Sequence, residues 1–272
     1  MSRLVRCGAV TWHVQELGDG PGLLLVHGAG SSADSFRALM PLLALRFRVV
    51  AVDLPGHART RVSRAFTPDL PSIARALGEL VAALKLAPHT VVGHSAGAAV
   101  IARMTLDGAI HPERIVGLAA ALVPFDGAAG LLFPSAARLL GASRFAPRLL
   151  ARAVSAGSTV DRIIEGTGSR LDEPSLAHYR SLASQPGHIA GVLSMLSRWD
   201  LAPLQRALPR LRTPVLLIAG EHDLAVPLSQ QRAVARVLPD ARLVVVPGAG
   251  HLIHEEVPQR VAALVQKSDN PR

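Results

Sequence analysis

Several residue types are scarce in this sequence, and each shortage excludes a class of protein. The 272 residues include one cysteine, Cys7, so an intramolecular disulfide and a disulfide-rich secreted fold are excluded. Aromatic residues make up only 3% of the chain, too few for a surface on which nucleic-acid bases stack. No uncharged apolar stretch reaches about 18 residues, the length that indicates a membrane-spanning helix. We therefore expect no signal peptide, no membrane span and a cytoplasmic location.

Lysine is also scarce, although the chain is basic overall. The 29 basic residues outnumber the 20 acidic ones and give a formal net charge of +9, yet Lys85 and Lys267 are the only lysines. The arginines are scattered singly or in pairs, without the Lys/Arg-rich run or the interleaved aromatic residues of a nucleic-acid site. The charge therefore favours contact with acidic surfaces, and we expect no nucleic-acid partner.

Apolar residues, in contrast, are abundant: they make up 49% of the chain, enough to bury one large core. Short runs that are apolar on both faces alternate with helical windows, a pattern typical of parallel strands covered by helices on two sides. We predict an α/β fold with a doubly wound, mostly parallel sheet, opened by an antiparallel hairpin. The expected strands lie in 23–28, 48–56, 90–95, 114–124, 214–223 and 241–251, and the expected helices in 33–45, 71–86, 96–107, 228–238 and 258–266.

The alternation stops between residues 125 and 199. No run in this segment resembles a strand, and short helical windows are separated by Gly, Pro and Ser. A helical cap inserted after a sheet strand fits this pattern, and the absence of a polar linker favours a cap that packs on the core. We therefore predict a core formed by residues 1–124 and 200–272, and a helical cap formed by residues 125–199.

The strongest chemical signal is the run GHSAG, residues 93–97, which follows an apolar strand and precedes a helical window. The pattern G-x-S-x-G in this context places the serine on a sharp strand-to-helix turn and exposes its hydroxyl above the sheet edge. Small residues on both sides of the serine allow the helix to approach the strand. We predict that Ser95 is a nucleophile and that the Ala96 N–H, at a helix N-terminus, stabilises a developing oxyanion.

An acid and a base follow Ser95 in the chain order that this kind of serine nucleophile needs. Asp223 ends the run GEHD after one expected strand, and His251 ends the next strand. Because the carboxyl ends of parallel strands meet at one edge of a sheet, we predict a triad in which Asp223 orients His251 and His251 activates Ser95. Asp126, which follows another expected strand, is the alternative acid.

Other residues near the expected strand ends have weaker signals. The loop after the first parallel strand contains Ala29, whose backbone N–H we predict to be the second oxyanion donor. We interpret His27 and His57 as structural, and His254 as a surface or helix-capping residue. The spacing H-x-x-H at His251 and His254 comes without further ligands, and no phosphate-binding glycine motif follows a strand, so we predict no metal and no cofactor.

Runs along the whole chain resemble the α/β-hydrolase superfamily: LLLVHGAG, VVAVDLPGHA, VVGHSAGAA, LLIAGEHD and PGAGHLIHEE. The further segments RMTLDG, AALVPFDG, GTGSRLD and HIAGVLSMLSRWDLAPL resemble the BchO-type magnesium-chelatase accessory proteins of bacteriochlorophyll biosynthesis. The superfamily resemblance implies Ser95 as nucleophile, Asp223 as acid and His251 as base. Two positions depart from what this family leads us to expect, since Ala58 replaces a glycine and Phe36 a tryptophan.

These patterns together predict a serine hydrolase that acts on an apolar ester or a related acyl bond. The resemblance to the accessory proteins implies a tetrapyrrole or its ester as ligand, with magnesium-chelatase subunits as partners. Two alternatives are a non-catalytic accessory protein that binds porphyrin or chelatase subunits, and a cofactor-free haloperoxidase or C–C bond hydrolase. Dehalogenases and epoxide hydrolases of this superfamily would have Asp in place of Ser95. The expected walls of the substrate pocket are Phe125, Tyr179, Met195, Leu196 and Trp199.

Overall fold

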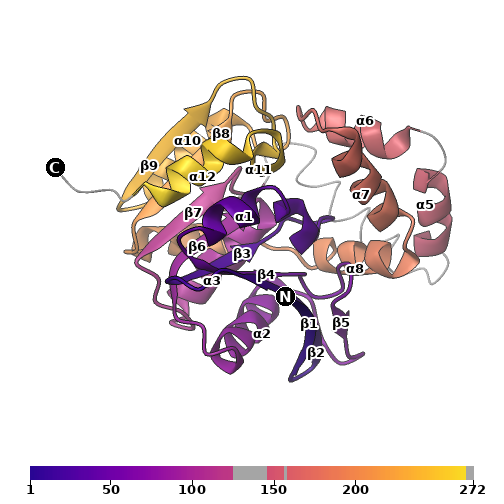
Figure 1. Cartoon of the computed structure of the whole chain (residues 1–272), viewed down its shortest axis with the longest axis horizontal. Helices are drawn as coiled ribbons and strands as arrows, with labels where there is room; N and C mark the ends of the chain where they lie inside the picture. The colour runs from indigo at the N-terminus through magenta and orange to yellow at the C-terminus, as the bar shows by residue number, and fades with distance from the viewer. Residues whose placement is uncertain (125–145, 156–157, 268–272) are drawn as a thin grey trace.

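The computed structural model describes residues 1–124, 146–155 and 158–267, and its centre is a nine-stranded sheet (Figure 1). Phe125 and Asp126, predicted as a pocket residue and an alternative acid, lie outside the described residues. The sheet order is β1-β2-β4-β3-β6-β7-β8-β9, and β5 pairs with β2. The strands are β1 (Ser2–Cys7), β2 (Val10–Leu17), β3 (Gly22–Val26), β4 (Arg48–Val52), β5 (Arg61–Val62), β6 (Pro88–His94), β7 (Arg114–Leu118), β8 (Val215–Gly220) and β9 (Ala241–Val246).

The sheet begins antiparallel and continues parallel. Strands β1 and β2 form a hairpin, β2 runs antiparallel to β4, and every pair from β4 to β9 along the sheet is parallel. In the register, Val26 lies beside Val52 on one side and Gly93 on the other, so the ends of β3, β4 and β6 are level. The prediction of a mostly parallel sheet opened by an antiparallel hairpin is confirmed.

Successive residues of the parallel strands enter two different cores, because side chains alternate across a sheet. Leu24 and Val26 belong to one buried cluster, whereas Leu23 and Leu25 belong to the other. The first cluster is covered by α2 (Leu70–Ala83), α3 (Ala96–Leu106), α9 (Ala202–Ala207) and α10 (Leu228–Val237). The second is covered by η1 (Ala33–Phe36), α1 (Leu39–Ala44), α11 (Ile253–Glu256) and α12 (Pro258–Gln266). Both faces of the sheet are therefore buried, as the two-sided apolar runs indicated.

Several expected strands end before the last residue of the predicted range, most of all the one predicted in 114–124. The apolar run 114–124 forms a strand only to Leu118, because Ala119 adopts a left-handed backbone conformation with φ of +47° and the chain leaves the sheet. Another short helix, η2 (Leu208–Arg210), precedes β8. Apolarity alone did not reveal where the strand ends, since the residues after it are still buried.

The described helices within residues 125–199 are grouped beside the sheet (Figure 1). They are α5 (Ala146–Ser155), α6 (Thr159–Gly166), α7 (Glu173–Ala183) and α8 (Pro186–Leu196), called the cap helices below. No strand lies among the described residues of this segment. We propose that residues 125–199 form a cap inserted into the core made of 1–124 and 200–272.

Helix α8 lies directly on a core loop through two glycines. A Cβ atom on Gly191 would lie 2.0 Å from the carbonyl oxygen of Gly56, and one on Gly56 would lie 3.0 Å from the Gly191 Cα. Real Cβ atoms do not approach backbone so closely, so this contact requires glycine on the helix. The contact holds α8 against the loop that follows β4.

We expect Gly191→Ala to lower the free energy of unfolding by about 1–3 kcal/mol, since the added methyl group must push α8 away from the loop. Gly187→Ala is the matched control, because Gly187 lies on the same helix with no atom within 4 Å of the added Cβ. It should raise stability by up to about 1 kcal/mol through helix propensity. Urea unfolding measures both values, and equal effects of the two substitutions would contradict the close seating of α8.

Candidate active site

Ser95 lies on a strained turn between β6 and α3. Its backbone has φ of +49° and ψ of −117°, a conformation that a non-glycine residue rarely adopts. Three backbone hydrogen bonds hold it there: the Ser95 N–H donates to the Leu118 carbonyl at 2.9 Å, and the Ser95 carbonyl accepts from Ala98 at 3.1 Å and Ala121 at 3.2 Å. The turn is thus fixed from β6, α3 and the segment after β7.

Close backbone packing explains why the GHSAG run has glycine at two positions. A Cβ on Gly93 would lie 2.5 Å from the Ala98 Cα, and a Cβ on Gly97 would lie 2.2 Å from the Val26 carbonyl oxygen. Helix α3 can therefore start directly above β3 and β6 only because both positions lack a side chain. The sharp turn that the sequence predicted is present.

His251 and Asp223 form a hydrogen-bonded pair beside this turn. The His251 Nδ1 lies 3.1 Å from Asp223 Oδ1 and 3.0 Å from Oδ2, and both residues are buried. Asp223 Oδ1 also accepts from the N–H groups of Ala225 at 2.9 Å and Val226 at 2.8 Å. A carboxylate held in this way fixes the proton on His251 Nδ1 and leaves Nε2 free to accept a proton.

Ser95 and His251 line the same cavity, although they come from opposite halves of the chain. Among the described residues, the structure contains no direct hydrogen bond between the two side chains. In ligand-free active sites this contact is often long and shortens when substrate binds. The arrangement therefore brings the predicted nucleophile, base and acid to one edge of the sheet.

The two predicted oxyanion donors also lie at this edge. Ala96 is the first residue of α3, so its N–H has no partner within the helix. Ala29 lines the cavity with Ser95, and its neighbour Gly28 packs so tightly that an added Cβ would lie 3.0 Å from the Ser95 Cβ. The turn containing Ala29 is thus in contact with the nucleophile.

The cavity around Ser95 has a volume of about 270 Å³ and a mainly apolar wall. Cap helices α6, α7 and α8 supply much of this wall, and core loops supply the residues next to Ser95. The apolar side chains that line it are Val160, Ile163, Ile164, Ile189, Val192 and Leu252. A cavity of this composition suits an uncharged apolar group.

Of the predicted pocket residues that the structure describes, one lines the cavity and three do not. Tyr179 lines the cavity, but Met195, Leu196 and Trp199 are not among its lining residues. Met195 is fully buried in the core cluster under the sheet, and Trp199 packs against the same cluster. For Met195 and Trp199 the prediction was wrong because their side chains pack in or against the core cluster. In α8 it is Ile189 and Val192, and not Leu196, that line the cavity.

The interpretation of His254 as a surface residue was also wrong. His254 is completely buried, and its ring lies 4.5 Å from that of His94 and 4.9 Å from that of Phe36. Burial, with a smaller effect of His251, lowers the pKa of His254 to about 3. Burial also lowers the pKa of His94 well below its usual value. Two neutral imidazoles therefore pack behind the candidate base.

Tyr179 connects the cavity wall to a buried carboxyl group. Its hydroxyl donates to Glu255 Oε1 at 2.6 Å and lies 3.2 Å from the Ser31 hydroxyl. Burial raises the pKa of Glu255 to about 7, against the lowering effects of Tyr179 and Arg37. Sequence patterns had not indicated Glu255, because its partners are far away in the chain.

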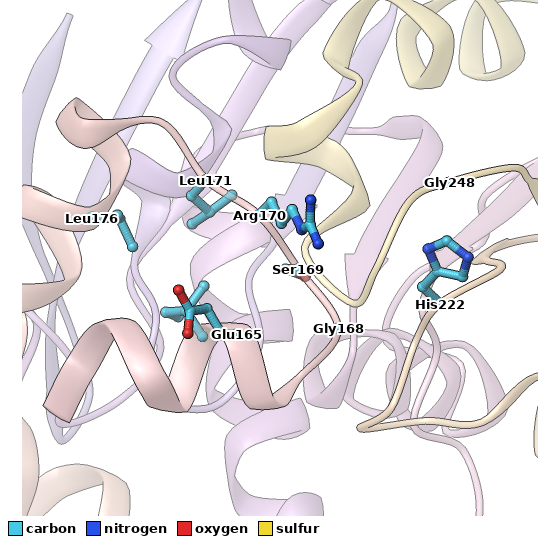
Figure 2. Close-up of a pocket in the computed structure, with 9 residues that line it drawn as sticks. Glu165, Gly168, Ser169, Arg170, Leu171, Leu176, His222 and Gly248 are labelled. Carbon is cyan, nitrogen blue, oxygen red and sulfur yellow. The ribbon is translucent and has the colours of Figure 1, made fainter. Parts of the chain in front are cut away.

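A second cavity of about 790 Å³ lies between the cap and the loops after β8 and β9 (Figure 2). Glu165, Arg170 and His222 lie on its walls, and Ile164 borders both cavities. None of the three candidate triad residues lines it. The chemistry predicted for Ser95 therefore belongs to the smaller cavity.

The part of the chain that the structure describes has neither a cluster of metal ligands nor a helix suited to a membrane crossing. Within residues 1–124, 146–155 and 158–267, no three His, Cys, Asp or Glu side chains are grouped so that they could hold a metal ion. Over the same ranges, no helix combines the length and the apolar character that a membrane crossing requires.

The chain is similar to a family model, to known proteins in sequence and to solved structures in fold. A family model described as the alpha/beta hydrolase family matches residues 23–264. The magnesium-chelatase 30 kDa subunit of Rhodobacter capsulatus is 40% identical over 96% of this chain and 91% of its own length. Haloalkane dehalogenase 2 of Mycobacterium tuberculosis is 29% identical over 93% of this chain and 89% of its own. Among solved structures, the epoxide hydrolase CorEH has a TM-score of 0.82 at 24% identity and covers 97% of this chain, with 96% of its own chain covered.

Proposed function

Because the chain belongs to the alpha/beta hydrolase family, we propose that it is a serine hydrolase that cleaves an apolar ester or a related acyl bond. One observation carries the proposal: His251, hydrogen-bonded to the buried Asp223, lines the same apolar cavity as Ser95 on its strained turn. A nucleophile, a base and an orienting acid in this relation are what acyl transfer requires.

The proposed reaction runs through an acyl-enzyme. His251 Nε2 accepts the hydroxyl proton as Ser95 Oγ bonds to the substrate carbonyl carbon, and the oxyanion is stabilised by the N–H groups of Ala29 and Ala96. The C–O bond to the leaving alcohol then breaks, and His251 returns its proton to that alcohol. Water next attacks the acyl carbon, gives a proton to His251 and releases the acid, and the proton returns to Ser95.

The identity of the nucleophile supports an esterase-type reaction over those named for two of the similar proteins. A dehalogenase or an epoxide hydrolase of this fold would be expected to use a carboxylate nucleophile, and this chain has Ser95 at that position. A serine hydroxyl, once deprotonated, attacks a carbonyl carbon and forms an acyl ester. Fold similarity alone does not select between these reactions, so the proposal relies on the side chain at position 95.

The substrate we propose is an ester borne by a magnesium-tetrapyrrole precursor. The similarity to a magnesium-chelatase subunit supports this pathway. The cavity of about 270 Å³ is slightly smaller than typical ligand pockets, which have volumes of about 300–1,000 Å³. Its size favours entry of one ester group, while a macrocycle would stay outside Ser95's cavity.

A second candidate function is supported by the same relative. We propose that the protein also associates with magnesium-chelatase subunits, as the name of the Rhodobacter capsulatus protein suggests for that protein. This association does not require Ser95, so catalysis and association can be separated by substitution.

Asp223→Asn should lower kcat for a short-chain p-nitrophenyl ester by about 10³- to 10⁴-fold, because an amide no longer fixes the His251 tautomer. Asp126→Asn should change kcat less than threefold by our estimate, about the effect of a site outside the triad. Steady-state kinetics on both variants decide between the two candidate acids. A large loss in Asp126→Asn together with a small loss in Asp223→Asn would reassign the acid.

A further inference from the structure

The turn that contains Ala29 is held from below by one imidazole. His27 Nδ1 lies 2.7 Å from the Gly28 carbonyl, and the Leu54 N–H donates to His27 Nε2 at 2.8 Å. Because a backbone N–H only donates and a carbonyl only accepts, the ring carries its proton on Nδ1. His27 is completely buried, so this neutral bridge joins the oxyanion turn to the loop after β4.

A second imidazole makes the corresponding bridge from the cap. His188 Nε2 lies 3.2 Å from the Gly30 carbonyl, and the Ala58 N–H donates to His188 Nδ1 at 3.1 Å. The same reasoning places the proton of this ring on Nε2. His188 comes from α8, is 4% exposed, and lines the cavity that contains Ser95.

The two histidine bridges fix the turn by hydrogen bonds on either side of Ala29. The carbonyl groups of Gly28 and Gly30 are both held, and the peptide N–H of the residue between them is the proposed oxyanion donor. The partner loop is itself strained, since Ala58 has φ of +43°. A bond from the Ala58 N–H to His188 therefore helps to hold a conformation that this residue disfavours.

Among the described residues, His188 reaches a backbone carbonyl of this turn, while the His178 Nε2 of α7 lies 2.9 Å from the hydroxyl of Ser32 just after it. The Gly56–Gly191 contact fixes α8 on the loop after β4, within one helical turn of His188. Tyr179 of α7 also reaches the turn, through the Ser31 hydroxyl at 3.2 Å. When α8 is seated, its imidazole completes the set of bonds around the oxyanion turn.

We propose that His188 is a positioning residue that couples seating of the cap to formation of the oxyanion site. This inference rests on the proposed serine hydrolase function. It assigns a role in the transition state to a cap residue that touches neither Ser95 nor His251 by a hydrogen bond. The bond changes in catalysis are those already described, and His188 neither gains nor loses a proton in them.

His188→Leu tests the proposal, with His188→Gln as the variant that retains an N–H donor near the position of Nε2. We expect His188→Leu to lower kcat by about 10²-fold, the size of effect that a small misplacement of catalytic groups produces. KM should change little, because the oxyanion forms only after substrate binds. The Ki of a trifluoromethyl ketone, which binds as an oxyanion, should rise in parallel with the loss of kcat. His188→Gln should recover most of the loss.

Ile189→Ala is the matched control, because Ile189 is adjacent on α8 and lines the cavity without a bond to the turn. It should change KM more than kcat. Amide hydrogen exchange of residues 27–32 supplies a readout that does not depend on activity: exchange should quicken in His188→Leu and stay unchanged in Ile189→Ala. If wild-type protein hydrolyses no ester, the proposed function fails, and exchange still tests the bridge. Unchanged exchange in His188→Leu, or a loss confined to KM, would overturn the positioning role.

Discussion

Ser95→Ala is expected to lower kcat/KM for p-nitrophenyl butyrate by about 10⁴- to 10⁶-fold, the size of loss seen when a nucleophile that acts as part of a unit is removed. The fold should remain intact, because alanine and serine have a similar backbone preference and the substitution therefore adds no strain to the turn. The three hydrogen bonds at residue 95 are made by the backbone and do not involve the side chain. Residual hydrolysis should come from the oxyanion site alone.

Ser184→Ala is a suitable control for this measurement. Ser184 is exposed at the end of α7, where its hydroxyl donates to the Ser181 carbonyl at 2.8 Å. Its kcat/KM should equal that of wild type when the two proteins are purified in parallel. A comparable rate in Ser95→Ala would mean that the hydrolysis comes from another residue or from a contaminating enzyme.

Ser95→Ala also separates catalysis from association with chelatase subunits. If the association is independent of hydrolysis, Ser95→Ala should bind those subunits with the affinity of wild type while its esterase activity is lost. Binding measured by calorimetry with the purified subunits gives this comparison. Loss of both properties in a folded variant would contradict two separable functions.

The free energy of unfolding is expected to fall steeply as the pH falls from about 6.5 toward 4. Burial lowers the pKa of six histidines, to about 4 for His188 and about 3 for His254. In the unfolded chain these groups accept protons below about pH 6.5, whereas in the folded protein they accept protons only at a lower pH, so a fall in pH through this range favours unfolding. The remaining four, with pKa values lowered chiefly by burial, are His27, His57, His94 and His178.

Each such histidine lowers the free energy of unfolding by roughly 1 kcal/mol for every unit by which the pH falls. Glu255 acts in the opposite sense, because its pKa is raised to about 7 and its folded form binds the proton first. One group opposing six leaves a net loss of stability, which is large against the total of about 5–15 kcal/mol for a folded domain. Urea unfolding at pH 7, 6 and 5, followed by tryptophan fluorescence, measures the slope.

His254→Phe tests whether buried histidines cause the pH dependence of the free energy of unfolding. Both ring nitrogens of His254 are buried, and neither has a hydrogen-bond partner among the residues that the structure describes. Because the neighbours include Phe36, an aromatic hydrocarbon fits the surroundings. The substitution should reduce the pH dependence by roughly 1 kcal/mol per unit, the share of one histidine. A stability that stays constant between pH 6.5 and 5 in wild type would contradict the account of neutral buried histidines.

The fold was predictable because its signals are local. Runs such as residues 23–26 are apolar on both faces, which indicated a sheet covered on two sides, and the two core clusters confirm it. The GHSAG run also predicted its own geometry, since the turn at Ser95 and the missing side chains at Gly93 and Gly97 are features of five consecutive residues.

The cap side of the site was less predictable because its contacts are between residues distant in the chain. His188 bonds to residues 130 and 158 positions away, and no periodicity in α8 marks it. Met195 lies seven residues further along the same helix, yet it is buried in the core. An apolar helix placed between a cavity and a core does not reveal from sequence which of its residues face which.

The most direct test of the central claim is covalent labelling of the wild-type protein with a fluorophosphonate, read by intact mass beside Ser95→Ala. An activated serine attacks phosphorus and keeps the phosphonyl group, so the proposal predicts one added group on wild type and none on the variant. Absence of labelling in a folded wild-type protein, or equal labelling of both proteins, would contradict Ser95 as an activated nucleophile.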